Sequence, residues 1–288
     1  MSILLEPFAY GFFVSGVVVA TLAGVLCGLV GVYVVLRGMS YIGHGLSHAI
    51  FGGAVASFVA KVNFYVGAAA WGFVAALLVN RVARRRTIGA DAAIGVVTTA
   101  SFAVGLALIS RFRSFTRNFE AALFGNVLGV RLQDALVVGG VLLVAAAFVF
   151  FAYRPLLFTT FDPEVAEASG VPTGRIDAGF ALLLAATIVA TMNILGVLLI
   201  AAALVIPAVV ARLLTDSFGR MLWLSMLVGG LSGFAGMYLS WYLNVSSGAT
   251  IVLTQAAFFM VAFALTGLRR RHGIAPRPAV PPGTQSGW

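Results

Sequence analysis

The sequence predicts an all-α, polytopic membrane protein with eight or nine transmembrane helices, plus short interfacial and cytoplasmic coupling helices. Of its 288 residues, 61% are hydrophobic and only 9% are charged, against about 25% charged residues in a soluble domain. Seven stretches of 19 to 47 residues contain no Asp, Glu, Lys or Arg. Because a helix needs about 20 apolar residues to cross the hydrocarbon core, this pattern excludes a soluble protein.

The uncharged stretches place the membrane spans in order. Five of them fit one helix each: 10–36, 41–60, 62–80, 92–110 and 135–153. The stretch 178–211 would be about 51 Å long as one helix, so it must break once, and Met192-Asn193 is its strongest polar interruption. The stretch 221–267 breaks best between Asn244 and Gly248, where polar and small residues cluster. We therefore expect nine spans.

The basic residues indicate orientation. They lie between the apolar stretches, so the net charge of +9 reflects topology, and we expect a lipid bilayer rather than nucleic acid as partner. With the run Arg269-Arg270-Arg271 on the cytoplasmic side, 13 basic residues fall inside and five outside, which agrees with the positive-inside rule. Segment 119–130 is too short to cross, and we expect an interfacial or re-entrant helix there. If it did cross, everything before it would be inverted.

The cytoplasmic segment 155–175 contains the signals of a short helix. Asp162 is a suitable N-cap, Pro163 fits the first helical position, and Glu164 is an acid in the first turn. Gly170 with Pro172 beyond it ends the helix, which we expect at 163–169. A basic, proline-rich tail, 269–288, follows the permease domain 1–268 and is expected to be disordered and cytoplasmic.

Pairs of glycines mark expected helix contacts. Gly24 and Gly28 have the GxxxG spacing in the first span, and Gly229 and Gly233 repeat it in the eighth. Such glycines allow two backbones to approach closely. We favour packing within one chain over an interface between two chains.

Two histidines form the candidate metal site. His44 and His48 are four residues apart, so their imidazoles lie on one face of a helix. Ser40 and Ser47 share that side and could support the imidazoles by hydrogen bonds. From spacing alone, a bound or transported metal and a hydrogen-bonded packing pair both stay open.

The sequence argues against an enzyme. A zinc metalloprotease with this histidine spacing needs a glutamate directly after the first histidine, where this chain has Gly45. There is also no G-x-x-x-x-G-K-[ST] phosphate loop, so any ATP must be hydrolysed by another chain. The single cysteine, Cys27, excludes a disulfide within the chain. We expect no permanently bound cofactor.

Several motifs resemble one transporter family. The segment Val35 to Ala49, V-L-R-G-M-S-Y-I-G-H-G-L-S-H-A, resembles the second-helix signature of the zinc and manganese permease family of ABC importers. Asp91 to Gly95, Glu120 to Asn126, Phe161 to Gly170 and Ser247 to Leu253 are similar to further family segments. The most specific match is Asn193 to Thr215, N-I-L-G-V-L-L-I-A-A-A-L-V-I-P-A-V-V-A-R-L-L-T. The resemblance covers about 11–268.

The resemblance implies a homodimeric permease in the plasma membrane of a bacterium. It also implies a cytoplasmic ATP-binding-cassette ATPase dimer and an extracytoplasmic metal-binding lipoprotein as partners. The family's metal site has an acidic residue and a histidine four apart, which map to His44 and His48, so this chain departs from it at His44. Four imidazoles from two copies suit Zn²⁺ better than Mn²⁺, and we therefore expect zinc as the transported divalent metal.

The resemblance also gives the short cytoplasmic helix a role. Its acidic residues Asp162, Glu164 and Glu167, with Pro163 and Gly170 at its ends, are expected to dock on the ATPase and couple it to transport. The alternatives are a secondary transporter or channel for a metal, and an ABC importer permease for another small substrate.

Overall fold

Long apolar helices dominate the computed structural model, which describes residues 3–83, 90–112, 123, 125 and 129–271. Every regular element within those residues is a helix. Eight of them are long and apolar enough to cross a membrane. They are α1 (Gly11–Leu36), α2 (Ser40–Val59), α3 (Phe64–Ala83), α4 (Ala90–Arg111), α6 (Leu132–Phe151), α9 (Thr173–Leu195), α11 (Phe218–Leu243) and α12 (Ser247–Arg271). The predicted all-α, polytopic architecture is confirmed.

Four shorter helices complete the described chain: η1 (Ile3–Ala9), α7 (Tyr153–Phe161), α8 (Pro163–Ala168) and α10 (Ile200–Leu214). With its 15 residues, α10 is about 22 Å long, which is less than the ~30 Å hydrocarbon core. The ninth expected span is therefore a short helix.

The predicted break at Met192-Asn193 is wrong. Helix α9 continues to Leu195 and ends at Gly196, whose φ of +81° is in the left-handed region that favours glycine. Asn193 stays helical because its side-chain amide donates a hydrogen bond to the Tyr65 hydroxyl on α3, at 3.1 Å. A polar residue with a partner on a neighbouring helix does not need to interrupt its own helix.

The predicted break of the stretch 221–267 is confirmed. Helix α11 ends at Leu243, Asn244 has a left-handed φ of +51°, and α12 begins at Ser247. Asparagine tolerates this conformation better than other non-glycine residues, because its short polar side chain bonds locally.

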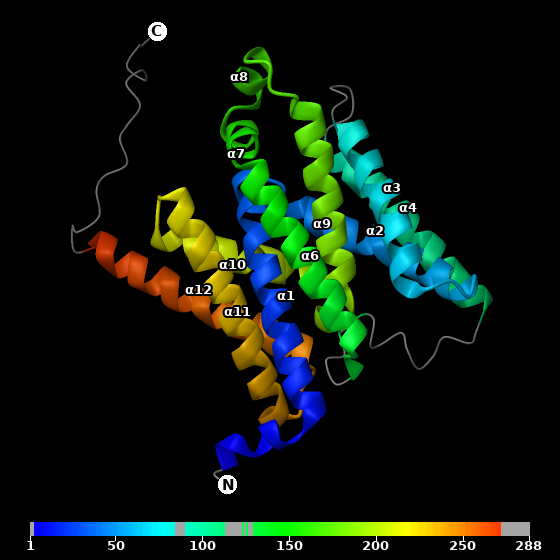
Figure 1. The fold of residues 1–288 in the computed structure, drawn as a ribbon, viewed down its shortest axis with the longest axis vertical. Coiled ribbons are helices and arrows are strands. Elements are labelled where there is room, and N and C mark those ends of the chain that lie inside the picture. Colours follow the sequence, from blue (N-terminus) through cyan, green and yellow to red (C-terminus); the bar gives the residue numbers. More distant parts are fainter. Residues whose placement is uncertain (1–2, 84–89, 113–122, 124, 126–128, 272–288) are drawn as a thin grey trace.

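Helix α1 runs through the middle of the molecule and packs along α11 (Figure 1). A Cβ added to Gly24 would lie 2.0 Å from the Gly229 carbonyl oxygen, so only glycine allows this approach. The Ser225 hydroxyl donates to the Gly28 carbonyl oxygen at 2.7 Å across the same contact. The interpretation of the paired glycines as packing within one chain is confirmed.

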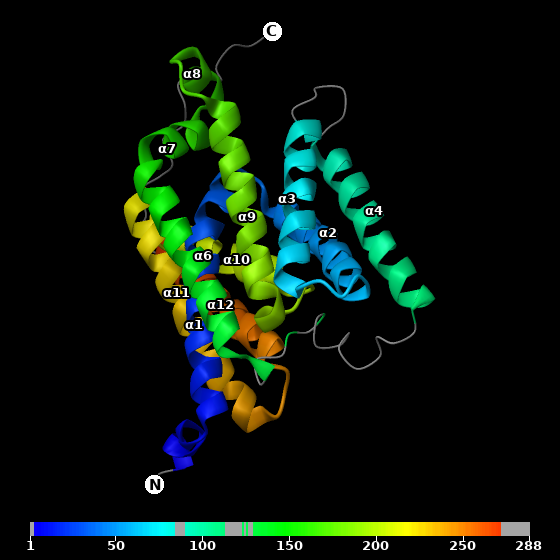
Figure 2. The same ribbon diagram turned by 45° about the vertical axis from the view of Figure 1, so that its right-hand side comes forward.

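The helices define two ends of the molecule. The N-terminal end of α1 and the turn between α11 and α12 lie at one end, while α7 and α8 lie at the other (Figure 1). Helices α2, α3 and α4 stand together beside the α1–α11 pair, with α9 between the two groups (Figure 2). Close packing of α2 on α4 again depends on glycine, since a Cβ on Gly52 would lie 2.1 Å from the Ser101 carbonyl oxygen.

Two expected segments fall largely outside the described residues. The interfacial helix at 119–130 is described only at 123, 125, 129 and 130. Of the expected tail, 269–271 belong to α12, and 272–288 lie outside the described residues.

Candidate functional site

The two candidate histidines lie side by side on α2, as their spacing predicts. The ring centroids of His44 and His48 are 4.6 Å apart. Tyr41 lies one turn before His44, with its ring centroid 6.2 Å from the imidazole. On the other side, the His48 ring meets the edge of Phe102 on α4, at 4.9 Å between centroids. One face of α2 therefore presents both imidazoles to α4.

Both imidazoles line a pocket of about 260 Å³ between α2 and α4. Its lining residues are Tyr41, His44, Gly45, His48, Gly95, Thr98, Thr99 and Phe102. The volume holds several water-sized groups, at about 30 Å³ each. Gly45 keeps α4 close, because a Cβ there would lie 2.6 Å from the Ile94 side chain and 2.9 Å from that of Thr98.

His48 has a donor atom available for a ligand. Its Nδ1 is buried and has no hydrogen-bond partner within the described part of the chain. A neutral imidazole nitrogen without a partner is the usual ligand atom for a transition metal. No group of three or more His, Cys, Asp or Glu side chains suited to a metal occurs among the residues that the structure describes. As far as its side chains are described, one copy of the chain thus offers two imidazoles and no carboxylate at this pocket.

The two serines lie on the same helix as the imidazoles. Ser47 is fully buried, and its hydroxyl donates to the backbone carbonyl oxygen of His44 at 2.7 Å. It therefore contacts the backbone of a candidate ligand rather than its ring. Ser40 is the first residue of α2, one turn before His44. Support of the imidazoles by either serine stays a prediction.

The predicted short helix beyond the membrane spans is confirmed as α8, one residue shorter than expected. The Asp162 carboxylate accepts a hydrogen bond from the Val165 backbone N–H at 3.0 Å, which caps the helix, and Pro163 is its first residue. Gly170 has a φ of +82°. Glu164 and Glu167 are exposed, as a docking surface requires.

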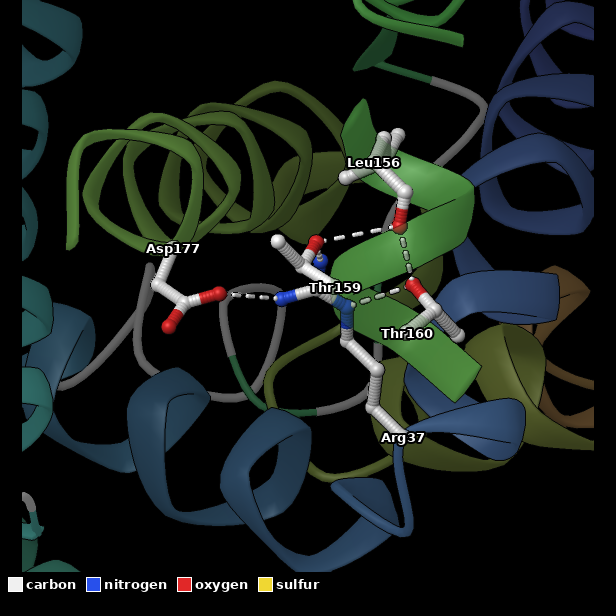
Figure 3. A network of polar contacts seen from close by, with 5 residues as sticks. All are labelled: Arg37, Leu156, Thr159, Thr160 and Asp177. Carbon is white, nitrogen blue, oxygen red and sulfur yellow. Dashed lines mark hydrogen bonds and ion pairs between the residues drawn. The ribbon is translucent and has the colours of Figure 1, made fainter. Parts of the chain in front are cut away.

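Helix α7 was not predicted. Pro155 is the third residue of α7, in the first turn, where proline is tolerated because the backbone N–H has no partner within the helix. Two of its residues, Thr159 and Thr160, bind the side chain of Arg37 at the end of α1 (Figure 3). In the sequence, the charge of Arg37 indicates topology alone, yet its side chain is 7% exposed and pairs with Asp177 of α9 at 2.8 Å. Burial lowers the pKa of the Arg37 guanidinium, and the Asp177 carboxylate counteracts this shift.

Comparison with known proteins identifies the family. Residues 9–266 match the ABC 3 transport family. The chain belongs to this family. It is 37% identical over 255 residues to the "Manganese transport system membrane protein MntC" of Halalkalibacterium halodurans, covering 88% of this chain and 87% of the relative. It is 34% identical over 268 residues to the "Probable iron transport system membrane protein" of Haemophilus influenzae, covering 93% and 98%.

A solved structure supports the same assignment. PsaBC from Streptococcus pneumoniae, in complex with Fab, has a TM-score of 0.82 and 32% identity, with 90% of this chain and 94% of that chain covered. The family resemblance inferred from the sequence is thereby confirmed. As an ABC 3 family member, this chain is a multi-pass membrane component of a transport system.

Proposed function

We propose that this chain is the permease of a bacterial ABC importer for a divalent transition metal, with Zn²⁺ favoured over Mn²⁺. The observation that carries the proposal is the pair of imidazoles, 4.6 Å apart, in a pocket between two apolar helices. Polar groups at this position in a membrane helix are costly, so they are functional candidates by default. The relatives whose names specify manganese and iron transport support a metal as substrate.

The donor set supports zinc. Zn²⁺ is bound by nitrogen and sulfur ligands with tetrahedral geometry, whereas Mn²⁺ prefers carboxylate, carbonyl and water oxygens. The polar side chains of the pocket lining are two imidazoles, two threonine hydroxyls and the Tyr41 phenol. Of these, Thr98 already donates to the Ile94 carbonyl oxygen at 2.6 Å.

The ligand count supports a homodimer. One copy provides His44 and His48, and a closed zinc site needs four ligands. A second copy, related by two-fold symmetry, would supply the other two imidazoles. Because two copies would share one ion, we expect about one metal per dimer and no permanently bound cofactor.

ATP hydrolysis is assigned to a separate cytoplasmic ATPase dimer, because the sequence has no phosphate loop. The acidic residues Asp162, Glu164 and Glu167, at the α7–α8 end of the molecule, are proposed to dock on it, which places this end and the C-terminus in the cytoplasm. The last turn of α3, which contains Arg81, lies toward the same end (Figure 2), and Arg37 contacts α7 there. Both residues agree with the positive-inside rule. An extracytoplasmic lipoprotein would deliver metal at the opposite end.

The test measures retained metal and ATP dependence together. The chain is purified with its ATPase, equilibrated with equimolar Zn²⁺ and Mn²⁺, and bound metal is counted by mass spectrometry. The His44→Ala/His48→Ala variant is compared with His272→Ala, which makes the same chemical change in the predicted tail. We expect zinc at about one ion per dimer, lost only in the double variant.

Each other outcome changes a defined part of the proposal. Retention of Mn²⁺ in preference to Zn²⁺ would overturn the choice of metal. Equal metal in the wild type and the double variant would show that the histidines pack rather than bind. Metal uptake into proteoliposomes without the ATPase would indicate a secondary transporter or channel.

A further inference from the structure

Arg37 connects three helices at the α7–α8 end of the molecule. It follows the last residue of α1, and its guanidinium donates to Asp177 Oδ1 on α9 at 2.8 Å. On α7 it donates from Nη2 to Thr159 Oγ1 at 2.9 Å and from Nε to Thr160 Oγ1 at 3.0 Å. Figure 3 shows the guanidinium between the carboxylate and the two hydroxyls.

The threonines are oriented to accept these bonds. Thr159 and Thr160 both donate their hydroxyl hydrogens to the Leu156 carbonyl oxygen, at 3.1 and 2.6 Å. Their oxygen lone pairs therefore face the guanidinium. Arg37 also lies over the Phe180 ring of α9, with 4.8 Å between its Cζ and the ring centroid. The planar guanidinium group of Arg37 is thus held in one orientation.

This arrangement joins the short helix α8 to the helix that carries the histidines. Thr160 is followed by Phe161, the last residue of α7, and α8 begins at Pro163. In the other direction, Arg37 is followed by Gly38, with a φ of +66°, and α2 begins at Ser40. His44 is on the second turn of α2. A displacement of α7 relative to α9 must therefore either break one of these hydrogen bonds or move the Arg37 side chain, which lies three residues before the start of α2.

We infer that Arg37 is a positioning residue that transmits movement of the α7–α8 segment to α2 and its histidine pair. The inference rests on the proposed function and deepens it, because it names the internal contact through which the ATPase would act on the metal pocket. An arginine that served only the positive-inside rule would lie in water, but this side chain is 7% exposed. A buried ion pair is also weak evidence for stability alone.

The test removes the hydroxyls and keeps the ion pair. In Thr159→Val/Thr160→Val the shape of α7 is kept, while its two bonds to Arg37 are lost. The matched control, Thr187→Val/Thr254→Val, makes the same change where each hydroxyl donates to the carbonyl oxygen one turn back, at 2.9 and 2.7 Å. Each complex of permease and ATPase is reconstituted in proteoliposomes with the lipoprotein, and zinc uptake and ATP hydrolysis are measured together.

We expect the number of ions moved per ATP to fall by about fivefold or more in the α7 variant, within the usual range of coupling effects. Basal ATP hydrolysis and metal retention by the histidines should stay at the wild-type level, and the control should match the wild type throughout. Asp177→Asn, which weakens the bond to α9 instead, should lower the same ratio. Each single valine variant is measured too, so that a folding defect in the double variant still leaves a readout.

The failures of the two proposals are distinguishable. If the wild-type complex moves no metal with ATP, the proposed function fails. If the wild-type complex moves metal and the α7 variants, single and double, keep its ratio of ions to ATP, the transmitting role of Arg37 is wrong. A lower melting temperature with an unchanged ratio would show that these bonds are structural only.

Discussion

The contact between α1 and α11 yields a sharp stability prediction for Gly24→Ala. The added Cβ would lie 2.0 Å from the Gly229 carbonyl oxygen and 2.6 Å from its carbon, both backbone atoms that no rotamer change can move. Ordinary contact requires about 3.5 Å, so the helices would have to separate by roughly 1.5 Å. Overpacking of this kind destabilises by about 1–3 kcal/mol.

A second loss accompanies the separation. The Ser225 hydroxyl donates a hydrogen bond to the Gly28 carbonyl oxygen at 2.7 Å, one turn along the same contact. Separation of the helices would stretch this hydrogen bond beyond bonding distance. Such a bond contributes about 1 kcal/mol, while Gly→Ala within a helix gains about 0.5–1 kcal/mol. The net loss is therefore about 2 kcal/mol, equivalent to a fall of roughly 4–8 °C in the melting temperature.

Thermal unfolding in detergent, followed by size-exclusion chromatography after heating, measures this difference. The matched control is Gly140→Ala on α6, where an added Cβ meets nothing within 4 Å. We expect this variant to melt at or slightly above the wild-type temperature. A Gly24→Ala protein as stable as Gly140→Ala would refute the close approach of α1 and α11.

Two further predictions concern the α7–α8 end and the opposite end of the molecule. Gly170→Pro should abolish metal uptake while ATP hydrolysis continues, because proline cannot adopt the φ of +82° at that position. Assays of uptake and hydrolysis check this, and unchanged uptake would contradict the docking role of α8. Tyr65→Phe should lower stability by about 1–3 kcal/mol, because the Tyr65 hydroxyl donates to the Asp134 carboxylate and accepts from the Asn193 amide. Thermal unfolding tests this, with Tyr10→Phe as the control because Tyr10 is exposed. Equal melting temperatures of the two variants would contradict a stabilising role for the Tyr65 hydrogen bonds.

Features that depend on neighbouring residues in the chain could be predicted from the sequence. Apolar length determines where helices can cross, and all eight long helices lie in uncharged stretches or extend them by a few residues. The cap at Asp162 and the end at Gly170 determine α8, because both act within one turn of backbone. The spacing of His44 and His48 likewise places both rings on one face of α2.

Features that depend on partners far along the chain required the tertiary structure. In the sequence, Asn193 is a polar residue that predicts an interruption of the helix. In the structure its amide bonds Tyr65, 128 positions away, and the helix continues to Leu195, with Gly196 as its C-cap. The sequence identified two candidate ligands, but the pocket in which they lie is formed by the close packing of α4 on α2, which Gly45 and Gly52 allow.

Arg37 illustrates the same division. Its charge at the end of an apolar stretch indicated a membrane boundary, which the sequence alone determined. The packing of α1, α7 and α9 decided its partners. These are Asp177, 140 positions away, and two threonines of α7, a helix that the local sequence signals did not reveal. Hydropathy acts along a single span and capping within one turn, whereas burial selects the partners of a charge from the whole chain.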